Sequence, residues 1–394
     1  MNEQMISRWQ ASNLPVLALC AAVLLHGLFS SPAPKIMGPA EILIALGLIT
    51  AIAPRALHLL HAPSVLENKA LCAWLWLLLV PLMIGLLSGH ETRDTSRDLV
   101  SFCFLGLPVL VMQLPRSDVK KFALAIAIAG AAMAARYWLL TDGFSALGNL
   151  RRGDALLYLS LDPMMLFAAI YFPITLVETT GKGPRAWLRR GIYFIAAFLC
   201  WGALGGMMMR GALSLGILSL SLYAIMHIRR PMVPFFMGIA ALMVVIAFSG
   251  PLLRFITDLW EKTQAVGLNS RDAEFVAIWK IQAADPFAFL FGQGWGAIYA
   301  SPAVGGYWVN YSHSALGFYF LKTGVLGLMI LAFYLLQIIW PLRRVVSEYK
   351  NILFAALPPL ILSFTIYTSY KFLGCGILLL LLQSLHAHSY PQSR

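Results

Sequence analysis

Long uninterrupted apolar runs constrain this chain more than any other feature of its sequence. Leu71–Leu87, Gly191–Met209 and Met232–Ser249 are each of the length that crosses a bilayer as a helix, which takes about 20 residues. These runs lack the apolar–polar alternation of membrane-barrel strands. Because lipid offers no partner to backbone polar groups, helices are the structure that fits them. We therefore predict an all-α polytopic membrane protein.

Composition and charge agree with this prediction. The 394 residues are 60% hydrophobic and 12% charged, and the mean hydropathy is +0.77. A soluble domain is about 45–50% apolar and about 25% charged. The net charge of +12 is divided among short clusters between apolar runs, as in the loops of membrane proteins, so we expect no nucleic-acid partner. The five cysteines lie inside apolar runs without metal-site spacing, so we expect no disulfide framework.

The apolar runs predict about twelve transmembrane helices in a single domain that covers residues 1–394. The first run follows Arg8, as a signal peptide would, but it is long and no small-residue cleavage site follows it, so we expect it to remain as a span. The predicted spans are 14–30, 39–54, 70–88, 99–114, 121–140, 161–178, 191–209, 211–227, 231–249, 313–340, 352–369 and 371–387.

The distribution of Lys and Arg predicts the orientation in the membrane. An even number of spans puts both termini on one side, and the segments on that side carry the larger share of the basic residues in short loops. Short cytoplasmic loops are enriched in Lys and Arg. We therefore expect a multi-pass inner-membrane protein with both termini cytoplasmic. Most acidic residues then lie near the periplasmic face, where we expect the chemistry.

A long periplasmic loop, residues 250–312, interrupts the regular spacing of the spans. Loops of this length are usually functional. We predict two short amphipathic helices in it, the first over residues 252–266 with Leu252 and Leu259 on its apolar face. The second begins with Asn269 or Ser270 as N-cap and ends at Pro286.

Two arginines in this outer region are candidates for binding an anion. Arg271 lies in the first turn of the second loop helix, where the helix N-terminus and a guanidinium together suit phosphate. The alternative is a surface arginine paired with Asp272 or Glu274. Arg210 lies in a very short outer turn between two apolar spans, where an ionisable group usually faces a cavity or a partner. The alternative is an arginine that extends to the head groups.

Four further basic residues are weaker candidates of the same kind. Arg136 lies at the outer end of the fifth span, and Arg151 and Arg152 lie in the loop after it. Lys322 lies inside the tenth span, where it either reaches the cavity or pairs with an acid.

His313 is the candidate general base. It begins the tenth span directly after the long loop, and an imidazole takes a proton from an attacking hydroxyl readily at neutral pH. The alternative is an interfacial histidine that bonds to the backbone. Asp272 and Glu274 are interpreted as a favourable arrangement at a helix N-terminus rather than a metal site. We expect neither a metal nor another cofactor.

Taken together, these positions resemble the O-antigen ligase family, within the superfamily of O-antigen polymerases and bacterial O-linked oligosaccharyltransferases. This chain has Ser314 where the family often has asparagine after the histidine. The residues that carry the resemblance are Arg210-Gly211, Asn269-Ser270-Arg271, Trp279, Pro286, Leu290-Phe291-Gly292-Gln293-Gly294, His313 and Thr323-Gly324-Val325-Leu326-Gly327.

The resemblance implies a GT-C-like membrane glycosyltransferase in the Gram-negative inner membrane. Such an enzyme transfers O-antigen glycan from undecaprenyl diphosphate to the lipid A–core oligosaccharide at the periplasmic face, completing lipopolysaccharide. It implies a metal-independent, inverting displacement with His313 as base. It also implies that Arg210 and Arg271 hold the diphosphate, with Trp279 and the weaker basic candidates at the lipid-linked glycan.

Three other functions remain open from the sequence. A polymerase would transfer the glycan to a second undecaprenyl-linked chain, and an O-linked oligosaccharyltransferase would transfer it to a protein hydroxyl. A secondary transporter or lipid flippase also has about twelve spans, but such proteins commonly contain internal repeats and charges near the membrane midplane. The sequence shows no repeat, and its ionisable residues gather at the outer edge.

Overall fold

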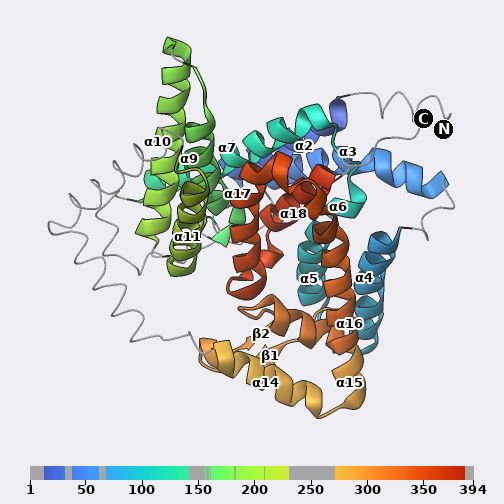
Figure 1. Cartoon of the computed structure of the whole chain (residues 1–394). Helices are drawn as coiled ribbons and strands as arrows, with labels where there is room; N and C mark the ends of the chain where they lie inside the picture. The colour runs from blue at the N-terminus through green and yellow to red at the C-terminus, as the bar shows by residue number, and fades with distance from the viewer. Residues whose placement is uncertain are drawn as a thin grey trace.

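The computed structural model describes residues 13–31, 38–61, 68–141, 156, 159, 161–181, 183–207, 209–229 and 271–386, and these residues are overwhelmingly helical (Figure 1). The helices are α2 (Leu14–Phe29), α3 (Pro39–His61), α4 (Lys69–Leu87), α5 (Thr92–Leu105), α6 (Leu107–Leu110), α7 (Arg116–Leu140), α9 (Pro163–Glu178), α10 (Pro184–Gly206), α11 (Arg210–Met226), α14 (Arg271–Ala283), α15 (Pro286–Phe291), α16 (Ala315–Ile339), α17 (Val346–Thr365) and α18 (Leu373–His386). Three short 3-10 helices, η4 (Pro302–Val304), η5 (Trp340–Arg344) and η6 (Thr368–Lys371), complete the helical elements.

The helices have the character of a membrane protein. Within the described ranges, four are long and apolar enough to cross a bilayer: Pro39–Leu59, Lys69–Leu87, Arg116–Leu140 and Ala315–Arg344. Shorter apolar helices are Leu14–Phe29, Pro163–Glu178, Arg210–Met226 and Leu373–Leu385. The predicted ninth span, 231–249, lies outside the described residues. A helical membrane protein is therefore confirmed in outline, and the count of twelve spans stays a prediction.

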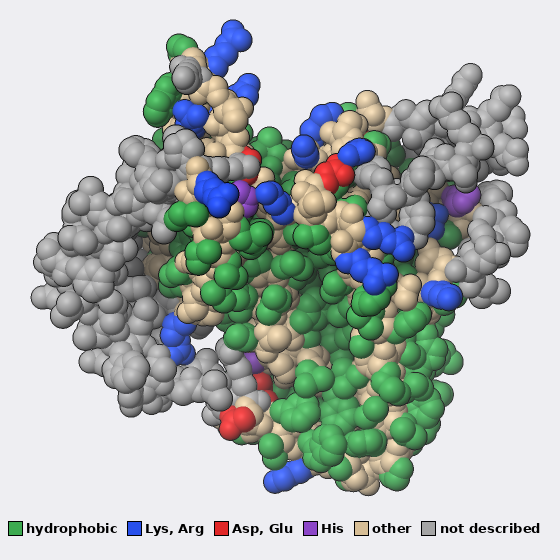
Figure 2. Space-filling model, in the orientation of Figure 1, with side chains coloured by type: hydrophobic (Ala, Val, Ile, Leu, Met, Phe, Trp, Pro, Cys, Tyr) green, Lys and Arg blue, Asp and Glu red, His purple; other side chains and the backbone are tan. Residues whose placement is uncertain are grey.

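The surface and the interior of the bundle differ as expected for a protein in lipid. On the outside, α3 exposes Ile42, Leu46 and Ile49 by half or more of their surface. Inside, α18 is almost completely enclosed, with Cys375 and Leu380 at 0% exposure. Figure 2 shows hydrophobic side chains over much of the visible body and Lys and Arg gathered mainly toward its upper end.

One end of the bundle carries a small cap. The segments α14, α15 and the hairpin of β1 (Tyr299–Ala300) and β2 (Trp308–Val309) lie together below α4, α5, α16 and α17 (Figure 1). The two strands are antiparallel, with Tyr299 opposite Val309. We call this the α14 end. The hairpin is a small departure from the all-α prediction, in a segment for which only helices were predicted.

Of the two helices predicted in the long loop, the structure describes one. The second predicted loop helix is present as α14, whereas the predicted first helix over 252–266 lies outside the described residues. Pro286 does more than end α14, because it also begins α15 after Asp285, whose carboxylate accepts hydrogen bonds from the N–H groups of Phe287 and Ala288.

The predicted span 99–114 is wrong in its boundaries. The helix α5 already begins at Thr92 and ends at Leu105, and α6 ends at Leu110. Gly106 separates the two helices and packs against the Trp74 indole, where an added Cβ would lie 2.5 Å from the ring. A side chain at this position has no room, which explains the glycine, whereas Pro108, which lacks a backbone N–H, lies in the first turn of α6 and prevents α5 from continuing.

Glycines fasten the cap to the bundle. Gly294 has φ +85°, and an added Cβ there would lie 2.2 Å from the Gly85 nitrogen in α4. At Gly324, with φ +64°, the helix α16 is kinked. The Leu321 and Lys322 carbonyls before the kink accept hydrogen bonds from the Gln293 and Gly294 N–H groups, at 2.9 Å each. The glycine-rich segment therefore allows close contact between the backbones of the cap and the bundle.

Candidate functional site

The centre of the candidate site is a histidine–carboxylate pair between two segments of the α14 end. His313 Nδ1 lies 3.0 Å from Glu274 Oε2, and the His313 backbone N–H donates to the same oxygen at 3.1 Å. Glu274 lies in the first turn of α14, and His313 lies two residues before α16 begins. The pair thus joins residues that are far apart in the sequence.

The other oxygen of Glu274 is held as firmly. Oε1 accepts hydrogen bonds from the Tyr299 hydroxyl at 3.0 Å and from the Ser301 hydroxyl at 2.6 Å. The Glu274 side chain is 1% exposed, whereas that of His313 is 26% exposed. The carboxylate is therefore enclosed, and of the pair only the imidazole is partly accessible from outside.

The hydrogen bonds keep Glu274 ionised. Burial by itself raises the pKa of this carboxyl group, but the hydrogen bonds from His313 and Ser301 and the attraction of the imidazole lower its pKa to about 2. Burial and the negative charge of Glu274, which disfavours a phenolate, raise the pKa of Tyr299 above its usual value, so Tyr299 remains a hydrogen-bond donor.

The ionised carboxylate fixes the tautomer of the imidazole. A carboxylate only accepts hydrogen bonds, so the hydrogen shared with Glu274 is on His313 Nδ1. In the neutral ring this leaves the lone pair on Nε2, where it can accept a proton. The arrangement orients a base and stabilises the imidazolium that forms when the base is protonated.

The residues around His313 are fixed by their own contacts. Tyr311 meets the imidazole edge to face at 5.7 Å between ring centroids, and the Tyr370 hydroxyl donates to the Ser312 carbonyl at 2.7 Å. Ser314 is the N-cap of α16, since its hydroxyl accepts a hydrogen bond from the Gly317 N–H at 3.1 Å. Serine and asparagine cap helices about equally well, so this departure from the family pattern keeps a competent cap.

A second buried carboxylate, Asp98 in α5, has a different environment. Its Oδ2 lies 2.6 Å from Lys322 Nζ and accepts a hydrogen bond from the Gly296 N–H at 3.0 Å. Its Oδ1 lies 3.3 Å from Lys371 Nζ. Asp98 and Lys322 are both 0% exposed, and Lys322 also donates to the Ala297 carbonyl. We call Asp98, Lys322 and Lys371 the buried ion cluster.

The buried ion cluster fixes the cap to the bundle. Lys322 belongs to α16 and Lys371 to η6, while the Gly296 and Ala297 backbone belongs to the cap. Of the two roles left open for Lys322, pairing with an acid is the one that the contacts describe.

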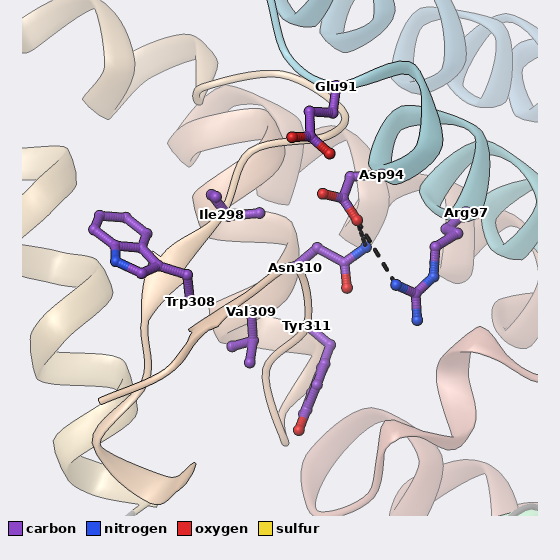
Figure 3. Close-up of a pocket in the computed structure, with 8 residues that line it drawn as sticks. All are labelled: Glu91, Asp94, Arg97, Ile298, Trp308, Val309, Asn310 and Tyr311. Atoms are coloured by element: carbon purple, nitrogen blue, oxygen red, sulfur yellow. Dashed lines mark hydrogen bonds and ion pairs between the residues drawn. The ribbon is translucent and has the colours of Figure 1, made fainter. Parts of the chain in front are cut away.

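A polar pocket is lined in part by Tyr311, whose ring lies beside that of His313. It has a volume of about 310 Å³ and is lined by Glu91, Asp94, Arg97, Ile298, Trp308, Val309, Asn310 and Tyr311 (Figure 3). Asp94 accepts a hydrogen bond from the Asn310 amide at 3.1 Å and lies 3.7 Å from Arg97. The first turns of α5 form one wall, and the strand that leads to His313 forms the other.

Arg210 begins α11, on the same end of the bundle as the pair. An added Cβ at its neighbour Gly211 would lie 2.9 Å from the Tyr367 hydroxyl oxygen. Tyr367 directly precedes η6, whose Tyr370 bonds to Ser312. A short sequence of contacts therefore connects the start of α11 with the residue before His313.

Arg136 has an evident structural contact. Its guanidinium donates to the Gly27 and Ser30 carbonyls, where α2 ends. Arginine at a helix C-terminus satisfies carbonyls that have no partner within the helix. Trp279 is 46% exposed and packs with Phe275, Phe289 and Phe320, so it is part of an aromatic cluster between α14, α15 and α16.

The remaining candidates are beyond what the structure describes. Arg151 and Arg152 lie outside the described residues, as does the side chain of Arg271, whose backbone begins α14 three residues before Glu274. Within the described residues no three His, Cys, Asp or Glu side chains gather as metal ligands would.

Sequence reasoning missed Glu274 as the partner of His313 and missed Asp98 altogether. In the sequence, Glu274 was interpreted only as a favourable negative charge at a helix N-terminus. A carboxylate in the first turn of a loop helix can also be reached by an imidazole from a neighbouring segment. Asp98 had a signal as well, because an acid next to a predicted span needs a partner.

No protein-family model matches the chain, and no curated protein is significantly similar to it.

Proposed function

We propose that the chain is a membrane glycosyltransferase of the O-antigen ligase type, which transfers a glycan from undecaprenyl diphosphate to a sugar hydroxyl of lipid A–core oligosaccharide. The observation that carries the proposal is the buried, ionised Glu274 that holds His313 with Nε2 free to accept a proton. A transfer to a hydroxyl needs such a base, and a helical membrane protein suits two lipid-anchored substrates.

The proposed reaction is a single displacement. The acceptor hydroxyl loses its proton to His313 Nε2 as its oxygen bonds to the anomeric carbon of the donor sugar. The bond from that carbon to the phosphate oxygen breaks, and undecaprenyl diphosphate leaves with the electron pair. Attack from the face opposite the leaving group inverts the anomeric configuration. Glu274 stabilises the imidazolium until the proton passes to water or to the departing diphosphate.

The leaving diphosphate requires fixed positive charge. The candidates are Arg271, at the N-terminus of α14, and Arg210, at the N-terminus of α11. A helix N-terminus and an arginine both attract phosphate. Their assignment rests on the sequence motifs and on the position of their backbones at the α14 end.

We propose further that the α14 end faces the periplasm. The opposite end carries Arg116, Arg343 and Arg344, in keeping with the upper concentration of basic side chains in Figure 2. Enrichment in Lys and Arg is typical of the cytoplasmic side of a membrane protein.

The test is transfer by the purified chain in detergent or nanodiscs, with undecaprenyl-diphosphate glycan and one acceptor at a time, with and without a chelator. Transfer to lipid A–core that survives the chelator supports the proposal. A glycan ladder formed without lipid A–core would replace it with a polymerase, and modification of a protein hydroxyl would replace it with an oligosaccharyltransferase. Absence of all three transfers, by a chain shown to be folded, would contradict it.

A further inference from the structure

The pocket beside His313 has the chemistry of a saccharide site. Glu91, Asp94 and Arg97 follow one another at intervals of three residues at the start of α5, so they project from one face of that helix (Figure 3). The two carboxylates can accept hydrogen bonds from hydroxyl groups, and the guanidinium can donate hydrogen bonds to them. Glu91 is the N-cap residue of α5, and within the described ranges its carboxylate makes neither a hydrogen bond nor an ion pair.

The opposite wall supplies an aromatic surface. Trp308 flanks the pocket and is 69% exposed, which is costly for so large an apolar side chain in water. Sugar rings carry hydroxyls at their edges and C–H groups on their faces. The carboxylates can therefore bind the hydroxyls at the edge of a sugar ring, while the indole opposite them packs against the C–H groups on its face.

The position of the pocket and the charge of its lining limit the class of ligand that it can bind. The strand β2, with Trp308 and Val309, is followed by Asn310 and then Tyr311, whose ring contacts the imidazole of His313. The pocket volume of about 310 Å³ suits a small group such as a single sugar ring. Two carboxylates against one arginine leave the lining negative, so a phosphorylated sugar is disfavoured.

We infer that this pocket binds a neutral or amino-bearing sugar ring of a glycan substrate and presents its neighbouring hydroxyl or anomeric carbon to His313. The inference rests on the proposed function for the identity of the glycan, and the acceptor oligosaccharide is the first source to be tested. The donor glycan has the same chemistry and is the second.

The experiment measures binding without any reaction. The full chain in nanodiscs is titrated separately with lipid-free core oligosaccharide and with donor glycan released from its lipid diphosphate, and binding is followed by saturation-transfer NMR. The variants are Trp308→Ala and the double variant Glu91→Gln with Asp94→Asn. Trp340→Ala is the matched control, since Trp340 is also exposed, at 60%, but belongs to η5 at the opposite end of the bundle.

We expect Trp308→Ala to weaken binding of one saccharide by about tenfold, the loss typical of removing a central aromatic contact, while Trp340→Ala changes nothing. The double variant should weaken the same saccharide to a similar degree. Loss confined to the core oligosaccharide assigns the pocket to the acceptor, and loss confined to the released glycan assigns it to the donor. Equal binding of both saccharides by the wild-type chain and Trp308→Ala overturns the inference.

Failure of this inference is distinguishable from failure of the proposed function. Unchanged saccharide binding in Trp308→Ala, together with normal transfer to lipid A–core, contradicts only the pocket assignment. Saccharide binding that depends on Trp308 in a chain that transfers nothing contradicts only the proposed reaction.

Discussion

Two buried carboxylates at the same end of the molecule have opposite relations to their surroundings. Glu274 is enclosed, but it bonds to His313, which is 26% exposed. Asp98 is enclosed and bonds to Lys322, which is 0% exposed, and to Lys371, which is 17% exposed. The first carboxylate orients a group that can reach a substrate, whereas the second joins α5, α16, η6 and the cap. On the proposed function, the comparison separates a residue that serves chemistry from one that serves assembly.

The largest effect that tests this comparison is expected from His313→Ala. Removal of the base should lower transfer by about 10²- to 10⁴-fold, the usual contribution of general base catalysis. Since His313 also bonds to the buried Glu274, its removal should lower the thermal unfolding temperature in detergent as well, but by less than Asp98→Ala, so transfer is compared at equal amounts of folded protein. Near-normal transfer by this variant would remove the proposed base.

Asp98→Ala should have the opposite profile. The substitution leaves two ammonium groups without their shared carboxylate, and loss of one partner from a buried ion pair costs about 3–5 kcal/mol. We expect a marked fall in folded yield and in thermal stability, with any remaining folded protein keeping part of its transfer activity. A stable but inactive Asp98→Ala chain would show that Asp98 belongs to the chemistry after all.

Glu274→Gln should show both kinds of effect, each smaller than in the two variants above. The folded-state pKa of about 2 lies below the ordinary value of 4.5, so the unfolded chain binds more protons in acid. The stability that Glu274 contributes is therefore complete above about pH 4.5 and is lost as the pH falls toward 2. From the two pKa values this amounts to about 3 kcal/mol.

The measurement for Glu274→Gln is unfolding at several pH values between 2 and 6, compared with the wild type. The difference between the two chains should shrink as the pH falls, and transfer at neutral pH should be reduced less than in His313→Ala. A difference in stability that does not depend on pH would contradict the ionised state of Glu274.

The smallest effect is expected from Arg136→Met, in which the methionine keeps part of the apolar stem. Hydrogen bonds from a charged donor contribute about 1.5–3 kcal/mol, and a half-buried site at the end of α2 should lie at the low end. Transfer should remain normal, as measured with both substrates at saturation. A strong rise in the KM for the donor would instead indicate that Arg136 binds the substrate.

The helical character was predictable because apolar runs report directly on lipid contact, as Leu71–Leu87 does in α4. The close packing of Gly106 against the indole of Trp74 was not, since the two residues belong to different helical segments of the chain. His313 could be singled out because it is the only histidine adjoining the long loop, and its role as a base stays a prediction. Its partner Glu274 was missed because 38 residues separate the two in sequence, and only the docking of α14 against the start of α16 brings them together. The pocket was missed for the same reason, since α5 and β2 meet only in three dimensions.

If the proposed function holds, the division of the pair between α14 and the start of α16 has a consequence for the newly made protein in its membrane. A chain whose cap has not yet docked has a histidine without its orienting anion and therefore lacks a competent base. Newly inserted or damaged copies would be inert toward lipid-linked sugar instead of hydrolysing it with water. On the proposed function, transfer would therefore depend on complete folding of the chain, without a separate inhibitor.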